Sequence, residues 1–290
     1  MSCFKCEWLI IANYFLYSLQ AQTWTQLSNV DSANIQGGDI SATSDNGRYV
    51  VMKSNDKEIL VRFDDFSMLT YKEHRGRLKS LAVSDDGIVI AGFERISSDG
   101  TETGLGMVQV LDTKDLSNPL DEEVWLSGFG TGVDITPDSS MVAIGSPEES
   151  TVYIFHLVEG TLPPSSEKIK HHDPRSKSFG WKVALSEDGK SIAVADPYSS
   201  VNNVESGAIF VYAWIEGDGW VDVQEILYGR NDMRKLGLAG VAIDDRRGRV
   251  DASDHNNHLY SFVVSEYDLM LLLLTLYLGS FSQDFSFIAV

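Results

Sequence analysis

Short apolar runs separated by polar turns are the main pattern of this chain. Val183 and Leu185 lie before the turn Ser186-Glu187-Asp188-Gly189, and an apolar run from Ile192 to Ala195 follows it. Serine at the first position and glycine at the fourth fit a type I turn whose last residue has a positive φ. A residue with a Cβ adopts that conformation at a cost of roughly 1 kcal/mol. The segment therefore predicts a β-hairpin.

A further strand is predicted directly after this hairpin and a polar loop. The segment 208–214 reads Ala-Ile-Phe-Val-Tyr-Ala-Trp and is apolar at every position. A strand that is apolar on both faces is expected to be buried on both faces. We therefore expect a sheet packed between two neighbouring sheets.

The hairpin pattern recurs along nearly the whole chain. The first residue of the turn falls at Ser44, Ser84, Thr136, Ser186, Asp244 and Ser282, in steps of 40, 52, 50, 58 and 38 residues. A four-stranded propeller blade needs about 40 to 50 residues. We predict an all-β fold, a β-propeller of four-stranded blades with about five complete blades and the start of a sixth, truncated from a six- or seven-bladed ring. A β-sandwich with regular hairpins is the alternative, although nothing in a sandwich requires one motif at a blade-length period.

Two copies carry a second motif that resembles a known family. Phe129-Gly130 is followed by Gly145-Ser146-Pro147, and Phe179-Gly180 is followed by Ala195-Asp196-Pro197. These segments resemble FG-GAP repeats, the units of the propeller of integrin α subunits and of many extracellular proteins. The resemblance covers most of the chain and is sharp in these two copies, while Gly37-Gly38 and Leu236-Gly237 stand in for the first element. A WD40-type propeller is the alternative, but no Trp-Asp or Gly-His pair lies at the expected place.

The two ends of the chain differ from the repeats. Residues 1–21 are typical of a secretory signal peptide, with Lys5 before an apolar stretch and Ala21 at a plausible cleavage position, which leaves 22–290 as the propeller domain. An internal first strand is the alternative for the leader. The apolar run 269–278 has ten residues, well short of the about 20 that span a bilayer, so no membrane span is expected.

The net charge and the cysteine content limit the classes of partner and the location that can be expected for the protein. The net charge of −19 repels phosphate backbones, so we expect no nucleic acid partner. The two cysteines, Cys3 and Cys6, lie in the predicted leader, so a mature chain has neither a disulfide nor a thiol nucleophile. These features and the FG-GAP resemblance predict a secreted or extracellular protein.

No cofactor is expected, and calcium receives little support. The resemblance implies calcium loops in some blades, but turns such as Ser84-Asp85-Asp86-Gly87 are too short to wrap an ion that needs several converging oxygens. The best remaining oxygen ligands are Asp196 and Glu205, in a long loop of the fourth copy. His255 and His258 lack an evident third ligand, and His171-His172 is expected to face solvent within a long connection over 163–178.

No catalytic constellation is apparent, so a binding function is expected. Gly104-Leu105-Gly106 lacks the third glycine of a dinucleotide site. The tryptophans Trp125, Trp181, Trp214 and Trp220 fit packing between blades. Loops added to a propeller face are where ligands are usually met, which selects Tyr198, Asn202 and Asn203 as ligand contacts.

We expect a non-enzymatic, extracellular FG-GAP-like module that binds a protein or glycan. A propeller glycosidase or lyase with carboxylates at its funnel mouth, including pairs such as Glu148-Glu149, and an intracellular WD40-type scaffold are the alternatives.

Overall fold

The protein is built from antiparallel β-sheets with almost no helix. The computed structural model describes residues 15–20, 23–29, 40–55, 58–63, 68–72, 76–97, 99–116, 126–164, 166–173, 176, 178–200, 206–222, 227–229, 235–244, 248–256 and 258–263. One short 3-10 helix, η2 (Pro147–Glu149), is the only helical segment in these ranges. No helix among them is long and apolar enough to cross a membrane.

Five sheets follow one another in chain order, and we call them blades 1 to 5. Blade 1 contains β3 (Ser41–Thr43), β4 (Tyr49–Asn55), β5 (Glu58–Phe63) and β6 (Met68–Lys72). Blade 2 contains β7 (Gly76–Val83), β8 (Ile88–Ile96), β9 (Glu102–Asp112) and β10 (Leu126–Ser127). Blade 3 contains β11 (Val133–Ile135), β12 (Met141–Ser146), β13 (Thr151–His156) and β14 (Glu167–Lys170). Blade 4 contains β15 (Lys182–Leu185), β16 (Ser191–Asp196), β17 (Ala208–Ile215) and β18 (Gly219–Asp222), and β19 (Leu227–Tyr228) also pairs with β17. Blade 5 contains β20 (Val241–Asp244), β21 (Arg249–Ser253) and β22 (Leu259–Val263), and a separate hairpin is formed by β1 (Phe15–Gln20) and β2 (Thr23–Asn29).

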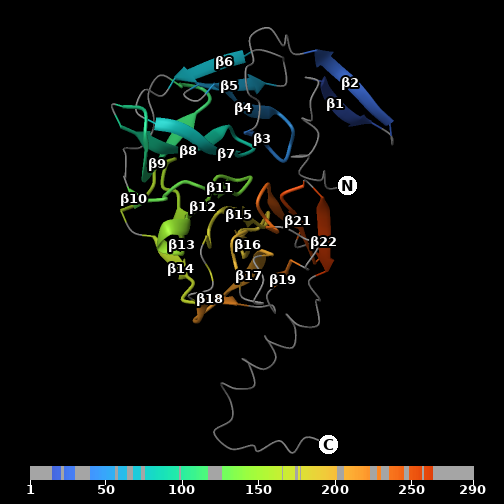
Figure 1. Ribbon diagram of the computed structural model, residues 1–290. Coiled ribbons are helices and arrows are strands. Elements are labelled where there is room, and N and C mark those ends of the chain that lie inside the picture. Colours follow the sequence, from blue (N-terminus) through green and yellow to red (C-terminus); the bar gives the residue numbers. More distant parts are fainter. Residues whose placement is uncertain are drawn as a thin grey trace, which may run out of the picture.

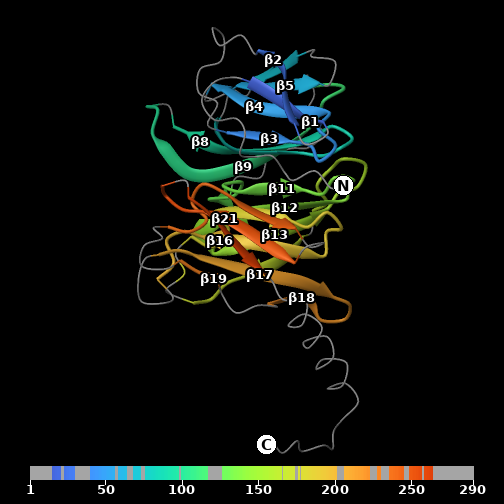
Figure 2. The same cartoon turned by 90° about the vertical axis from the view of Figure 1, so that its right-hand side faces the viewer.

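The blades are arranged as a propeller. Figure 1 shows them in chain order about a common axis, from blue blade 1 to orange-red blade 5. The first strands of successive blades contact one another: β3 contacts β7, β7 contacts β11, β11 contacts β15 and β15 contacts β20. Figure 2 shows the same sheets from the side, with the long curved strands β8 and β9 of blade 2. The predicted all-β propeller is confirmed, and a two-sheet sandwich is excluded.

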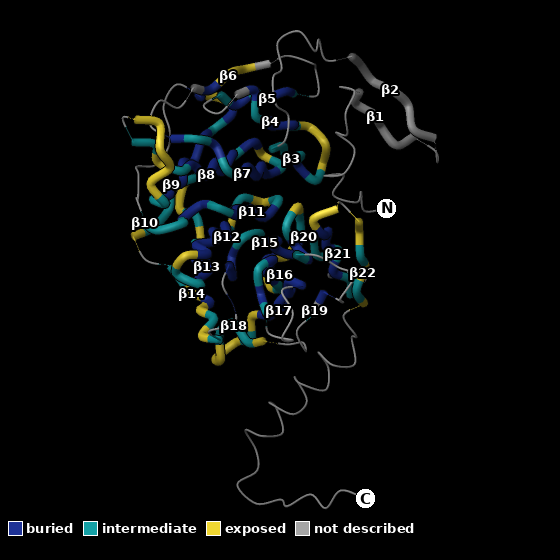
Figure 3. Tube along the Cα trace, in the orientation of Figure 1, coloured by how far each residue is buried: buried dark blue, intermediate teal, exposed yellow. Residues whose placement is uncertain are grey.

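The core lies between the blades, as Figure 3 shows by the buried inner strands. Each pair of successive blades encloses its own cluster of buried apolar side chains. Strand β17 serves two of them, because Phe210 joins the cluster shared with blade 3 while Ile209 and Val211 join the cluster shared with blade 5. Its predicted burial on both faces is confirmed for residues 208–213. Each such side chain contributes about 1.5–3 kcal/mol on burial.

The four predicted turns have the same geometry in blades 1 to 4. The fourth residue has a positive φ in each, at Gly47 (73°), Gly87 (93°), Ser139 (59°) and Gly189 (70°). The first hydroxyl donates to the third side chain, as Ser186 Oγ does to Asp188 Oδ1 at 2.8 Å, and accepts the N–H that opens the next strand, here Ser191 N at 2.9 Å. The polar side chains at the first and third positions of each turn therefore form the hydrogen bonds that close the hairpin.

The glycines of the FG-GAP-like motif allow close contact between blades. Gly130, Gly180 and Gly237 have φ values of 83°, 95° and 85°, and each follows a buried apolar residue. A Cβ on Gly145 would lie 1.9 Å from the carbonyl oxygen of Gly180 in the next blade. Leu236-Gly237 thus occupies the position that the sequence assigned to it, while Gly37-Gly38 lies outside the described residues.

Two expectations need correction, and others stay predictions or lie outside the described residues. The stretch 163–178 is not only a connection, because it contains β14, the outer strand of blade 3. Trp214 does not pack between blades, since it is 40% exposed at the end of β17. The part of the predicted leader from Phe15 to Gln20 forms β1, and cleavage of the leader stays a prediction. The apolar run 269–278 and the sixth copy at 282–290 lie outside the described residues.

Candidate functional site

A cavity of about 420 Å³ lies where blades 2, 3 and 4 meet. Its walls come from β7, β8 and β9, from the segments that contain Phe129 and Phe179, and from the loop after β16. The Phe-Gly segment precedes β11 and the Ser/Thr turn follows it. The cavity therefore lies at the end of the blades opposite the four repeated turns.

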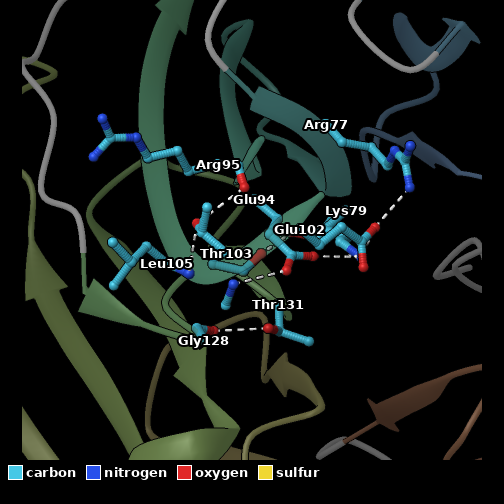
Figure 4. Close-up of polar contacts among 12 residues, drawn as sticks. Arg77, Lys79, Glu94, Arg95, Glu102, Thr103, Leu105, Gly128 and Thr131 are labelled. Atoms are coloured by element: carbon cyan, nitrogen blue, oxygen red, sulfur yellow. Dashed lines mark hydrogen bonds and ion pairs between the residues drawn. The ribbon is translucent and has the colours of Figure 1, made fainter. Parts of the chain in front are cut away.

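Charged side chains of blade 2 form one wall of the cavity. Lys79 Nζ lies 2.6 Å from Glu94 Oε2 and 3.2 Å from Glu102 Oε1. Arg77 Nη1 lies 2.7 Å from the same oxygen of Glu102. Figure 4 shows these side chains pointing toward one another from neighbouring strands. The result is a connected set of two cations and two carboxylates, which we call the charged wall. Lys79, Glu94 and Glu102 line the cavity, and Arg77 joins the set through its ion pair with Glu102.

Irregular strand pairing places these side chains. Lys79 is the extra residue of a β-bulge between β7 and β8, since Leu78 pairs with Phe93 and Ser80 with Gly92. A second irregularity sets the three residues 103–105 of β9 opposite Arg95 of β8. Bulges turn a side chain away from the regular pleat and are frequent beside functional sites. The pairs of β11–β14 and β15–β18 have no such shift.

The backbone of β9 adapts to the second irregularity. Gly104 has a φ of 72°, and its N–H donates to Glu94 Oε1 at 3.2 Å. Thr103 Oγ1 donates to the carbonyl oxygen of Arg95 at 3.0 Å. Glycine reaches this positive φ without the steric cost that a Cβ brings. Glu94 is thus held by both Lys79 and the backbone, and its side chain is 17% exposed.

The ion pairs keep both partners charged. Partial burial disfavours the charge of Lys79, but hydrogen bonds and attraction from Glu94 and Glu102 outweigh burial and raise the pKa of Lys79 above its usual value. The hydrogen bond from Lys79, aided by Arg77, lowers the pKa of Glu102 below its usual value. The charged wall therefore offers fixed donors and fixed acceptors at neutral pH.

Two aromatic side chains from blade 4 also line the cavity. The rings of Trp181 and Tyr198 meet edge to face, with centroids 5.7 Å apart and planes at 75°. Trp181 Nε1 donates to the carbonyl oxygen of Leu238 at 3.2 Å, and Lys235 Nζ lies 4.5 Å from the centre of the Tyr198 ring. These contacts fix both rings while they remain half-buried.

Blade 3 contributes an exposed carboxylate to the cavity. Glu148 extends from η2, and Ser127 Oγ donates to its carboxylate. A Cβ on Gly104 would lie 3.1 Å from Glu148 Oε1, and one on Gly128 would lie 3.2 Å from Glu148 Cγ. The absence of side chains at Gly104 and Gly128 therefore leaves the room that Glu148 occupies. Its neighbour Glu149 instead accepts from the Tyr153 hydroxyl, and burial followed by this interaction raises the pKa of Tyr153 to about 12.

The residues predicted from the sequence divide into three groups. Tyr198 lines the cavity, whereas Asn202, Asn203 and Glu205 lie outside the described residues. Asp196 is fully buried, and its two oxygens accept hydrogen bonds from Ser176 and Ser178. Its carboxylate therefore links the segment before β15, which contains Ser176 and Ser178, to the end of β16. Ligand contact by Tyr198 and metal binding by Asp196 with Glu205 stay predictions.

The histidines lie apart from the cavity lining. His172 is exposed, but the ring of His171 packs 5.2 Å from Phe179 and 4.4 Å from Phe210, which corrects its expected exposure to solvent. Burial lowers the pKa of His171, against the attraction of Asp173 and Asp196. His258 is exposed, with Nδ1 3.2 Å from Asp254 Oδ2. Within the described ranges no group of three or more His, Cys, Asp and Glu side chains is arranged to hold a metal ion.

The charged wall was not identified from the sequence. Lys79 and Glu94 stand in strands and have no neighbouring motif, and Glu102 lies in a polar stretch that resembles an ordinary hairpin. The available signal was Gly104-Leu105-Gly106, whose two glycines mark an irregular strand and a close approach to blade 3 rather than a nucleotide site.

No family model matches this chain, and no curated protein matches it. The fold established by the structure is a β-propeller. The FG-GAP resemblance rests on the Phe-Gly and Gly-Ser-Pro motifs themselves.

Proposed function

We propose that this protein is a non-catalytic, FG-GAP-like binding module that holds part of a protein or glycan partner in the cavity between blades 2, 3 and 4. The observation that carries the proposal is the combination of the charged wall with the half-buried rings of Trp181 and Tyr198. A concave site with few, well-placed polar groups and aromatic side chains is the usual form of a binding site.

The carboxylates of the cavity support binding more than glycoside hydrolysis. A glycosidase needs a carboxylic acid with a raised pKa to protonate its leaving group. Lys79 and Arg77 act in the opposite direction on Glu102. On the described inner strands, Asp134 is buried and accepts from the backbone N–H of Leu185 at 2.7 Å, which is a structural contact between blades 3 and 4.

An extracellular location belongs to the same proposal. It is supported by the leader-like residues 1–21, by the lack of cysteine after Cys6 and by the FG-GAP-like motifs. Expression in a secreting host, followed by N-terminal sequencing of the medium fraction, tests it. The expected result is a chain that starts at or near Gln22, whereas a full-length chain retained in the cytosol would favour an intracellular scaffold.

A binding screen tests the function. The purified full chain is presented to glycan and protein arrays with calcium and with a chelator, beside the variant Glu102→Gln. We expect binding that does not depend on calcium and that Glu102→Gln weakens. Asp99→Asn is the matched control, because Asp99 is an exposed carboxylate in the same blade that bonds to Ser97 and Thr101, where hydrogen bonds lower its pKa to about 2. Binding that Asp99→Asn and Glu102→Gln leave equally unchanged would place the ligand elsewhere.

A further inference from the structure

We infer that the ligand of the cavity is an uncharged sugar residue of a glycan, held through vicinal hydroxyl groups by the charged wall and through its C–H face by Trp181 and Tyr198. This inference rests on the proposed function and names the chemical class of the ligand. It follows from the charge balance, the geometry and the size of the site.

The charges of the wall are balanced within the protein. Arg77 and Lys79 are paired with Glu94 and Glu102 at 2.6–3.2 Å. A charged ligand group would have to replace one of these partners, which separates an existing ion pair in a partly buried place. An uncharged polar ligand leaves all three ion pairs in place, because it needs only hydrogen bonds to the charged groups.

Hydroxyl groups match such a wall. Each hydroxyl both donates and accepts, so a neighbouring pair of sugar hydroxyls can donate to a carboxylate and accept from a lysine at the same time. Hydrogen bonds with a charged partner are about twice as strong as those between neutral groups. Glu102 offers the most accessible of the paired carboxylates, with 40% of its side chain exposed against 17% for Glu94.

The aromatic side chains of the same cavity suit the apolar face of a sugar ring. Trp181 is anchored through Nε1 to Leu238, and Tyr198 is held between Trp181 and Lys235. Aromatic rings fixed in this way present apolar surface with little loss of side-chain freedom on binding. The cavity of about 420 Å³ lies near the small end of the usual range of 300–1,000 Å³ for ligand sites, which fits one sugar residue better than a folded peptide segment.

The competing occupant is a basic side chain of a protein partner, drawn by Glu102 and the exposed Glu148. Within the lining, Glu148 has its carboxylate bonded to Ser127, and the wall already contains a lysine. A second cation would therefore meet like charge at Lys79. The experiment below separates the two occupants.

The test titrates the full chain with methyl pyranosides of glucose, mannose, galactose, fucose and N-acetylglucosamine, with sialic acid as a charged sugar and with an arginine- and lysine-rich peptide. Tryptophan fluorescence and calorimetry report binding. We expect a saturable fluorescence change with at least one neutral sugar. We expect Glu102→Gln to weaken that binding about tenfold and Trp181→Phe to weaken it less, since removing a hydrogen bond to a charged group costs about one factor of ten or more.

The matched control is Trp214→Phe, an exposed tryptophan on β17 away from the cavity, which should leave affinity unchanged. Each variant is also melted, and Glu102→Gln should unfold within a few degrees of the parent because the side chain is largely exposed. Binding of the basic peptide or of sialic acid alone, weakened by Glu102→Gln, would overturn the neutral-sugar inference and leave the proposed function standing. No binding of any probe by a fully folded chain would overturn the neutral-sugar inference, and the array screen would then decide the proposed function separately.

Discussion

The two ends of the blades differ in what their polar residues do. At one end, four turns repeat one set of hydrogen bonds, in which the first hydroxyl bonds to the third side chain and to the backbone. At the other end, blades 2, 3 and 4 enclose the cavity, and the charged wall comes from blade 2 alone. Carboxylates at the turn end close hairpins, whereas those at the cavity end meet across strands.

In our proposal the repeated turns at one end serve stability, and the charged and aromatic side chains at the other end serve binding. Asp138 in the turn of blade 3 accepts hydrogen bonds from Thr136 and Ser140 of the same turn. Burial opposes its charge, but these hydrogen bonds outweigh burial and lower the pKa of Asp138. Asp86 of blade 2 also accepts from Ser139 in the turn of blade 3. In blade 2, one irregularity in strand pairing makes Lys79 an extra residue of β7, and a second sets residues 103–105 opposite Arg95, directly after Glu94. We therefore expect changes at the turn end to affect stability, and changes at the cavity end to affect binding.

The largest effect on stability is expected at the close contact between blades 3 and 4. Gly145→Ala puts a Cβ 1.9 Å from the Gly180 carbonyl oxygen, so blades 3 and 4 must separate. We expect a loss of roughly 3 kcal/mol or more in the free energy of unfolding, measured in urea. Gly217→Ala is the control, since a Cβ there meets nothing within 4 Å, and the positive φ of Gly217 (93°) alone should cost about 1 kcal/mol. Equal losses of unfolding free energy in the two variants would contradict the close contact between Gly145 and Gly180.

The next effect is expected at the turn end. Ser186→Ala removes a fully buried hydroxyl that donates to Asp188 and accepts from the N–H of Ser191. The orphaned groups should cost about 1–2 kcal/mol of unfolding free energy, while ligand affinity stays unchanged. A stability within experimental error of the parent would show that these hydrogen bonds do not hold the hairpin.

A smaller effect on stability is expected in the charged wall. Lys79→Met leaves Glu94 without its ion-pair partner at 17% side-chain exposure, which should cost about 1 kcal/mol. The affinity for the ligand should also fall in Lys79→Met, even under conditions where the variant is fully folded, because the variant loses a hydrogen-bond donor in the cavity. Unchanged affinity in Lys79→Met would remove the charged wall from the binding site.

The smallest effect is expected from pH. Because the pKa of Glu102 is lower in the folded protein than in the unfolded chain, its contribution to stability is complete above the unfolded value of about 4.3 and is lost as pH falls through the folded pKa. At 40% side-chain exposure the contribution is below about 1 kcal/mol. Urea titrations from pH 7 to pH 3 should show a slightly smaller acid loss for Glu102→Gln than for the parent. An identical loss would show that the pair does not act on stability.

The turn end could be predicted from the sequence because each turn is local. Ser186, Asp188 and Gly189 lie within four residues, and the geometry of such a turn depends on their own side chains and φ values. The recurrence of the pattern then predicted the propeller. β14 was missed since Ile169 is its one buried residue, so its alternation was too weak to recognise.

The cavity could not be predicted in the same way, because it combines residues from three blades. Lys79, Glu148 and Trp181 are far apart in the sequence and meet only when the blades pack. The bulge at Lys79 depends on pairing with β8 and has no signature of its own. Tyr198 was selected because its loop is longer than that of the preceding copy. This signal comes from comparing the lengths of loops between repeats, and the residue types of the loop do not provide it.

The most direct test of the account compares Ser186→Ala with Glu102→Gln in one pair of measurements, unfolding in urea and titration with the neutral sugar that binds the parent best. The account predicts that Ser186→Ala loses stability and keeps its affinity, whereas Glu102→Gln keeps its stability and loses about tenfold in affinity. Loss of affinity in Ser186→Ala at temperatures where it is folded, or full affinity in Glu102→Gln, would contradict the division between the two ends of the blades.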